Sequence, residues 1–139
     1  MPETTVMQAK RFGVYTCSPD STLVAAGTRM VDEDISALVV VDNDGLLAGI
    51  LTRSDLLRSY VDGVDAKNTP VSDYMTCDVV TVALTTTMRE VAQILSAHHI
   101  HRVVAVRPEG DRVRPIAVVS TADVLYHFNK SSVRSQNGG

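Results

Sequence analysis

The chain has 139 residues, of which 45% are hydrophobic and only six are aromatic: four Tyr, two Phe and no Trp. Its formal charge is −3, so it lacks the basic excess that binding to a phosphate backbone requires. No apolar run is long enough to span a bilayer, and the N-terminus shows no apolar stretch typical of a secretion signal. These features argue against a nucleic-acid-binding or membrane-inserted protein and predict a cytoplasmic one. Cys17 and Cys77 lack CxxC spacing, so two reduced, packed thiols are expected.

Residues 1–13 form an N-terminal segment in which a short helix from Glu3 to Arg11 is expected. Residues 14–61 then show the signals of one βαββα unit. A β-branched stretch opens the unit, and a Ser/Thr pair can cap the helix that follows. Apolar residues recur in that helix at the i, i+3, i+7 spacing of a buried face. They are Leu23, Ala26 and Met30.

A continuous β-rich run, Ala37–Val41, predicts a strand buried on both faces. Asp42–Gly45 supplies a tight turn, and Leu46–Thr52 is expected to return as the antiparallel partner. A short helix closes the unit with the apolar residues Leu56, Leu57 and Tyr60. Residues 62–78 are a mostly polar stretch, which predicts a linker and the entry to a second unit.

The same order of signals returns 65 to 68 residues later, in residues 79–128. Val103–Val106 repeats the buried strand, and Met88, Val91 and Leu95 repeat the apolar helix face. Pro115 cannot donate to a sheet ladder, so its strand is expected at a sheet edge. Residues 129–139 have the Ser/Asn/Gly composition of a disordered tail. Because one unit of about 50 residues cannot bury its own sheet and helices, we predict an α/β (α+β) fold of two repeats packed face to face.

Three stretches resemble a known family. Gly49–Leu57 follows the hairpin, Val71–Thr76 leads into the second repeat and Ile100–Val106 lies within it, in the order typical of the cystathionine-β-synthase (CBS) domain pair. The resemblance implies two CBS repeats packed sheet to sheet with pseudo-twofold symmetry. It also implies a regulatory module, usually a homodimer of pairs, whose two inter-repeat clefts bind adenosine compounds such as AMP, ADP, ATP or S-adenosylmethionine.

The resemblance also implies site residues. In ligand-binding members a Thr/Ser-x-x-Asp stretch at a strand-to-helix junction holds the ribose, which here corresponds to Thr52–Asp55 and Ser120–Asp123. A His-Arg pair reaches the phosphates in such members, and His101-Arg102 matches that pair. The residues expected in the first cleft are Thr52, Asp55, His101, Arg102, Asp78, Val79, Val80 and Ile50. Those expected in the second cleft, which lacks a charged pair, are Ser120, Asp123, Ser36, Ala37, Val14 and Tyr15.

Each of these signals has a structural alternative. The Thr and Ser of the two motifs can simply cap their helices, with the Asp residues in the first turns. His101-Arg102 can be a solvated entry to a strand. One departure affects the second cleft, because Lys10 falls where Met75 stands in the other repeat and puts its base pocket in doubt.

The chain shows no residue set typical of catalysis. No Ser or Cys has a base and an orienting group at a suitable spacing, and no glycine-rich phosphate loop is present. His98, His99 and His101 cluster, but no Cys or carboxylate joins them at ligand spacing, so no metal site is predicted. We therefore predict a non-enzymatic module that binds an adenine nucleotide, senses energy state and signals to a separate enzyme or transporter. The alternative is a ligand-free dimerisation or docking module.

Overall fold

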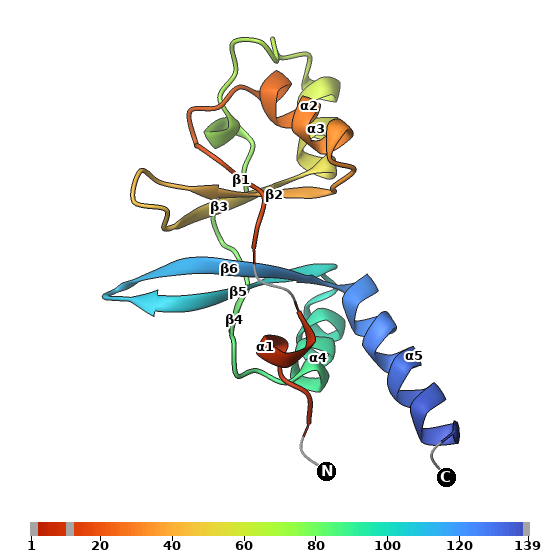
Figure 1. The fold of residues 1–139 in the computed structure, drawn as a ribbon. Helices are drawn as coiled ribbons and strands as arrows, with labels where there is room; N and C mark the ends of the chain where they lie inside the picture. The colour runs from red at the N-terminus through yellow and green to blue at the C-terminus, as the bar shows by residue number, and fades with distance from the viewer. Residues whose placement is uncertain (1–2, 11–12, 138–139) are drawn as a thin grey trace. The chain divides into compact units, whose positions relative to one another are not determined.

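The structure, a computed structural model, describes residues 3–10 and 13–137. The chain forms two compact units (Figure 1). Unit 1 comprises Met1–Gly13, Val80–Arg107 and Ile116–Gly139, and unit 2 comprises Val14–Val79 and Pro108–Pro115. In each unit the helices cover one face of a three-stranded sheet. The predicted fold class, α+β with two repeats, is confirmed.

Unit 2 contains the elements of the first repeat. Its sheet has the order β1-β2-β3, formed by Thr16–Cys17, Ala37–Val41 and Leu47–Thr52. Strand β1 runs parallel to β2, and β2 pairs antiparallel with β3, with Val39 opposite Ile50. Its helices are α2 (Leu23–Asp32), α3 (Arg53–Asp62) and the one-turn η1 (Val71–Asp73). The strand predicted over Ala37–Val41 is therefore confirmed with the same bounds.

The core of unit 2 is aliphatic. Leu23, Ala26 and Met30 lie on the buried face of α2, as their spacing predicts, and pack with Leu38 and Leu51 of the sheet. The hydroxyl of the N-cap Thr22 accepts a hydrogen bond from the Ala25 N–H at 3.1 Å, which fixes where α2 begins. The residues after α3 are not a detached linker, because Val64 and Ala66 also pack against this core.

Unit 1 contains the elements of the second repeat. Its sheet has the order β4-β5-β6, formed by Thr81–Ala83, Arg102–Glu109 and Arg112–Ser120. Pro115 lies in β6, the edge strand, as predicted. The helices are α1 (Val6–Ala9), α4 (Met88–His98) and α5 (Thr121–Asn137). Met88, Val91 and Leu95 form the buried face of α4.

Both terminal predictions need correction. The disordered tail predicted over residues 129–139 is instead helical as far as Asn137, because α5 meets no Pro or Gly before Gly138. Gly138 and Gly139 lie outside the described residues. The N-terminal helix expected from Glu3 to Arg11 is only the four-residue α1, and Arg11 also lies outside the described residues.

A short segment ahead of each repeat completes the core of the opposite unit. Val6 precedes the first repeat, yet it is fully buried in the core of unit 1, where its N–H donates to the Thr86 carbonyl at 2.8 Å. Val71 precedes the second repeat and is fully buried in the core of unit 2, where its N–H donates to the Ser21 carbonyl at 2.7 Å. Both pairs of positions are separated by 65 residues, so the internal repeat includes these exchanged segments.

The tip of the β5–β6 hairpin belongs to unit 2 because two arginines anchor it there. Arg112 pairs with Asp42 at 3.1 Å, and an Arg114 Nη donates to the Asp44 carbonyl at 3.0 Å. The backbone N–H of Leu46 is the main cause that lowers the pKa of Asp42, with further help from Arg112. The carboxylate of Asp42 therefore stays charged and keeps the β2–β3 turn and the hairpin tip together.

Candidate functional site

The first predicted motif forms a capping box at the junction of β3 and α3. The Thr52 N–H and hydroxyl both donate to Oδ2 of Asp55, at 2.8 and 3.0 Å, and the Asp55 N–H points back to the Thr52 hydroxyl at 3.4 Å. Asp55 is only 4% exposed. The capping role that the sequence left open is therefore real, and it fixes the orientation of a nearly buried carboxylate at the start of a ten-residue helix.

The second oxygen of Asp55 faces a cation that the sequence reading missed. Arg58 approaches Asp55 Oδ1 at 3.4 Å, donates to the Tyr74 carbonyl at 3.1 Å and lies over the Tyr74 ring. The signal was present in the sequence, because an Asp and an Arg three residues apart on a helix lie on one face. The side chain of Arg58 is more than half exposed, so this contact is open to solvent and can exchange with a ligand group.

A chain segment crosses β3 next to this capping box. Ile50 and Thr76 exchange two backbone hydrogen bonds of 2.9 Å, and this crossing lies directly over Gly49. A Cβ atom at Gly49 would stand 2.8 Å from the Thr76 carbonyl oxygen. The structure thus brings together three parts of the predicted first cleft: the strand residue Ile50, Thr52 and Asp55. Of the remaining members on this segment, Asp78 is exposed and Val79 half-buried.

Unit 1 carries the equivalent capping box, with one difference. The Ser120 N–H and hydroxyl donate to Oδ2 of Asp123, at 2.8 and 3.1 Å. The Nζ of Lys10 lies 3.1 Å from the same oxygen. Lys10 was recognised as a departure from the repeat, but its contact with Asp123 was not predicted. The ammonium neutralises the carboxylate that the second cleft would offer to a ribose.

His101 and Arg102 lie at the entry to β5 in unit 1. The His101 carbonyl accepts hydrogen bonds from the Thr121 N–H and hydroxyl, at 2.9 and 3.2 Å, beside the start of α5. The His101 side chain is exposed and Arg102 is half-buried. Val80 lies in the same unit, where its carbonyl accepts from the Val104 N–H at 3.1 Å. That the His-Arg pair serves the ligand of Thr52 and Asp55 stays a prediction.

The other residues predicted for the second cleft lie in unit 2. The Ser36 carbonyl accepts from the Arg53 N–H at 3.2 Å, a contact at α3 that matches the one between His101 and Thr121 at α5. Ala37 begins β2, Val14 is half-buried, and Tyr15 is exposed with Arg29 over its ring. Their participation in a second cleft with Ser120 and Asp123 also stays a prediction.

Two searches of the described residues give negative results. Within residues 3–10 and 13–137, no group of three or more His, Cys, Asp or Glu side chains is arranged to hold a metal ion. None of the helices in that same part of the chain is both long and apolar enough to cross a membrane. Of the two free cysteines, Cys17 is half-buried, and burial raises the pKa of its thiol. Cys77 is exposed, so the expectation of two packed thiols is wrong for this residue.

Two βαββα repeats, each ending in a helix capped by a Thr/Ser-x-x-Asp motif, define a tandem-repeat module. The model of one family, the CBS domain, matches the chain twice, over residues 2–62 and 71–130. The chain therefore belongs to the CBS domain family, which confirms the resemblance seen in the sequence, and a pair of such domains is a regulatory module.

Similar proteins include enzymes and small CBS proteins. The chain is 30% identical to inosine-5′-monophosphate dehydrogenase of Halobacterium salinarum over 128 residues, which cover 92% of this chain and 25% of that enzyme. It thus spans about a quarter of the dehydrogenase. It is also 30% identical to the CBS domain-containing protein YhcV of Bacillus subtilis over 112 residues, 80% of this chain and 76% of that protein.

One solved structure is the CBS domain pair of protein MJ0100, in complex with 5′-methylthioadenosine and S-adenosyl-L-methionine. It superposes with a TM-score of 0.83, covering 94% of this chain and 99% of that one, at 23% identity. This similarity shows the shared fold.

Proposed function

We propose that this chain is a regulatory CBS pair that binds an adenosine-containing ligand and signals its presence to a separate enzyme or transporter. The observation that carries the proposal is the buried, oriented carboxylate of Asp55 at the start of α3. The ligand class is AMP, ADP, ATP or S-adenosylmethionine, and a nucleotide ligand would make the chain a sensor of energy state.

The chemistry of this helix start suits a nucleoside. Ribose presents two neighbouring hydroxyl donors, and a carboxylate is an acceptor for both. Oδ2 of Asp55 is occupied by the capping box with Thr52, so a ribose would bind through Oδ1 and displace the solvent-exposed Arg58. The released guanidinium would then be available to a phosphate group. The unpaired N–H groups and dipole of α3 add a positive field that favours an anionic ligand.

Similarity to MJ0100 supports the adenosine class, since that CBS pair was solved with two adenosine compounds. We propose that the two sites of this chain differ in affinity. Asp123 already contacts the ammonium of Lys10, whereas Asp55 contacts an arginine that can move into solvent. The site of Thr52 and Asp55, with His101 and Arg102 as the expected phosphate ligands, should therefore bind more tightly.

A thermal-shift titration with AMP, ADP, ATP and S-adenosylmethionine tests the proposal. A ligand at 100 times its Kd stabilises the folded state by about 2.7 kcal/mol, which is several degrees in Tm for a chain of this size. Asp55→Asn and Asp123→Asn form a matched pair at the two capping boxes. We expect Asp55→Asn to cause the larger loss of the ligand-induced shift, after correction for each variant's own Tm. No shift with any ligand at millimolar concentration would refute nucleotide binding.

The second candidate is a ligand-free dimerisation or docking module. It is favoured by the apolar side chains that α2 and α3 leave exposed, among them Val31, Tyr60 and Val61. An Asp55→Ala, Arg102→Ala double variant separates the two candidates. If it regulates the partner protein as the wild type does, docking alone accounts for the function. In both cases we propose that the chain is a homodimer.

A further inference from the structure

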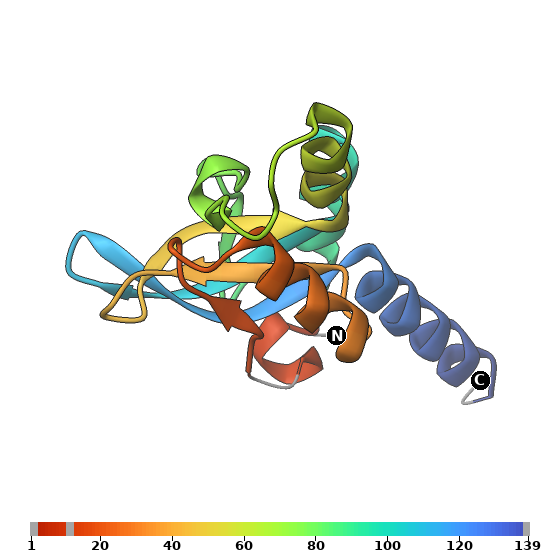
Figure 2. The ribbon, with the colours of Figure 1, turned by 90° about the horizontal axis from the view of Figure 1, so that it is seen from above.

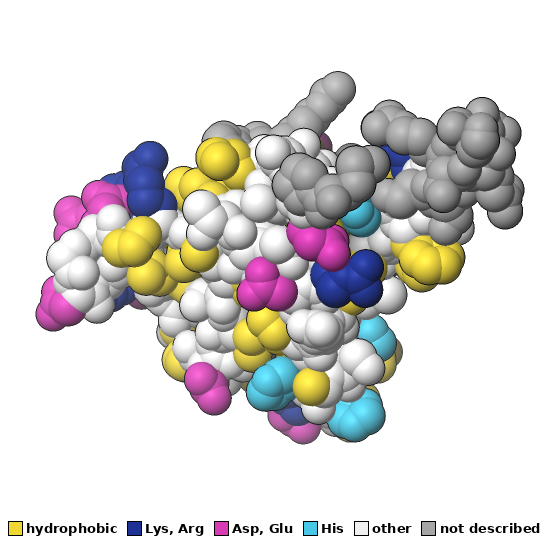
Figure 3. All heavy atoms as spheres, turned by 90° about the horizontal axis from the view of Figure 1, so that it is seen from below, with side chains coloured by type: hydrophobic (Ala, Val, Ile, Leu, Met, Phe, Trp, Pro, Cys, Tyr) yellow, Lys and Arg dark blue, Asp and Glu magenta, His cyan; other side chains and the backbone are white. Residues whose placement is uncertain are grey.

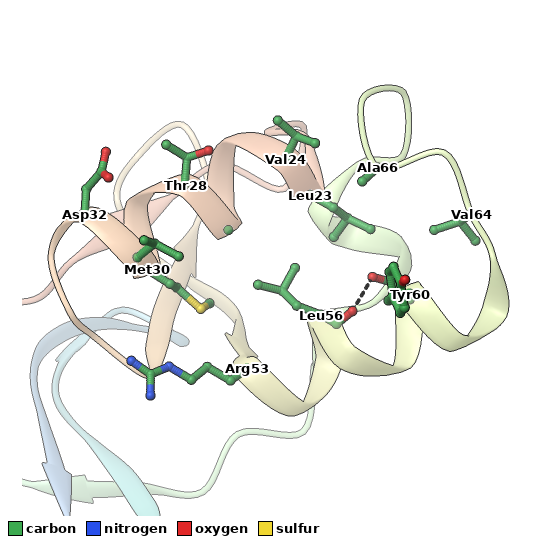
Figure 4. A pocket seen from close by; sticks show the side chains of 13 residues that line it. Leu23, Val24, Thr28, Met30, Asp32, Arg53, Leu56, Tyr60, Val64 and Ala66 are labelled. Carbon is green, nitrogen blue, oxygen red and sulfur yellow. Dashed lines mark hydrogen bonds between the residues drawn. The ribbon is translucent and has the colours of Figure 1, made fainter.

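A groove lies between α2 and α3 of unit 2. Its volume is about 700 Å³, and most of its lining is aliphatic. Leu23 of α2 and Leu56 of α3 point into the space between the two helices (Figure 4). At its edges Val31 and Tyr60 are 79% and 85% exposed. An open apolar groove with such exposed edges is typical of a protein-binding surface.

A matching apolar ridge lies on α5 of unit 1. Val124 packs against the core of unit 1, but Leu125, Tyr126 and Phe128 are 55%, 71% and 63% exposed. Within unit 1, the helix runs outward from the end of β6 and away from α4 (Figures 1 and 2). We call these three exposed residues the α5 ridge. The groove in unit 2 and the ridge in unit 1 are thus both open to solvent in a single chain.

The other long helix of unit 1 offers no comparable surface. The outward positions of α4 are mostly polar or charged, including Arg89, Glu90, Gln93 and Ser96. Seen from below, unit 1 shows charged and histidine side chains with hydrophobic ones only in separate small groups (Figure 3). The groove therefore has a counterpart on α5 and none on α4.

The charge of the chain is divided unequally between the units. Unit 2 holds 13 of the 16 acidic residues and six of the 13 basic ones, a formal charge of −7. Unit 1 holds the remaining three acidic and seven basic residues, a formal charge of +4. Contacts between two copies of unit 2 or two copies of unit 1 bring like charges together. A contact between unit 2 of one copy and unit 1 of another brings opposite charges together.

We infer that the α2–α3 groove of one copy seats the α5 ridge of a second copy. Shape and polarity match the concave apolar groove to the convex apolar ridge, and the charge division selects this head-to-tail contact over contacts between like units. A closed dimer repeats the contact twice, so each copy supplies one groove and one ridge. The inference rests on the proposed homodimer and specifies its surfaces. It does not depend on nucleotide binding.

Light scattering after gel filtration tests the inference on the full chain, at protein concentrations up to about 1 mM, where even weak specific association is visible. Val31→Asp disables the groove and Tyr126→Asp disables the ridge, at positions exposed enough to leave folding intact. Ser72→Asp in unit 2 and Gln93→Asp in unit 1 add the same charge at exposed positions outside both surfaces. Circular dichroism confirms that all four variants are folded.

We expect the two surface variants to be monomeric where the wild type and both controls are dimeric. A one-to-one mixture of Val31→Asp and Tyr126→Asp should recover dimer, because the intact ridge of the first fits the intact groove of the second. Raising NaCl from about 0.05 to 0.5 M shortens the screening length from roughly 14 to 4 Å, and this should weaken the wild-type dimer at least severalfold.

Three outcomes would overturn the inference. A dimer that survives Tyr126→Asp, or that salt strengthens, would mean that like units associate. A mixture that stays monomeric would mean that groove and ridge do not meet between copies. A wild type that is monomeric at every concentration would overturn the homodimer as well, whereas the first two outcomes leave the homodimer standing.

Discussion

Val6→Ala should destabilise unit 1 by about 2–3 kcal/mol, although residue 6 lies far along the chain from the second repeat. Val6 is fully buried in the core of unit 1, among Val91 and Val103. The substitution removes two methyl groups, a loss of about 1.6 kcal/mol at roughly 0.8 kcal/mol per buried carbon. A cavity of about 45 Å³ that does not collapse adds about 1 kcal/mol, at roughly 24 cal/mol per Å³.

Urea denaturation measures the loss, and amide hydrogen exchange shows where it falls. Exchange should rise more in β4, β5 and β6 than in β1, β2 and β3. Val71→Ala should give the opposite pattern, because Val71 fills the same position in unit 2. Met7→Ala is the control, since Met7 is 51% exposed and such a surface change is worth about 0.5 kcal/mol or less. If Val6→Ala costs no more than Met7→Ala, or raises exchange mainly in unit 2, the exchanged segment is not part of the core of unit 1.

Three further predictions follow from single contacts. Gly49→Ala should cost about 1–3 kcal/mol in urea denaturation, because the new Cβ meets the backbone carbonyl that crosses it; an unchanged midpoint would show that the crossing segment yields freely. Lys10→Met should change stability by about 1 kcal/mol or less, since the ion pair with Asp123 is partly exposed; a larger loss would make this contact structural. A thiol reagent at pH 8 should label Cys77 well before Cys17, because burial lowers access to Cys17 and the raised pKa of its thiol reduces the thiolate fraction; equal rates would contradict the described burial.

Much of the fold could be predicted because hydrophobic period and turn chemistry are local. The i, i+3, i+7 stripe gave the buried face of α2, and the continuous run Ala37–Val41 gave β2. The exchange of the segments at Val6 and Val71 was out of reach, since a single valine in a short polar stretch does not reveal which core receives it. The length of α5 was misjudged because Ser and Asn suit a tail by composition yet also continue a helix that has already started.

The candidate site was predictable in part for a similar reason. A Thr and an Asp three residues apart at a helix start fix each other locally, so the capping box at Thr52 was foreseen as one of two alternatives. The cations that contact these carboxylates were not foreseen. Arg58 shares a helix with Asp55 and could have been found from spacing, but Lys10 lies more than 100 residues from Asp123, and only the fold brings them together.

The exchanged segments mean that a cut through the middle of the gene does not separate the two halves of the fold. A fragment ending at Val79 would carry all the helices of unit 2, together with α1, a piece that the other fragment lacks. The fragment beginning at Val80 would expose the apolar hollow that Val6 fills in the intact chain. Two such fragments made separately should therefore recognise each other through α1, and a split reporter joined to them would signal their reunion. A tandem duplication with this wiring ties the two copies together from the start, because neither can be deleted without removing part of the interior of the other.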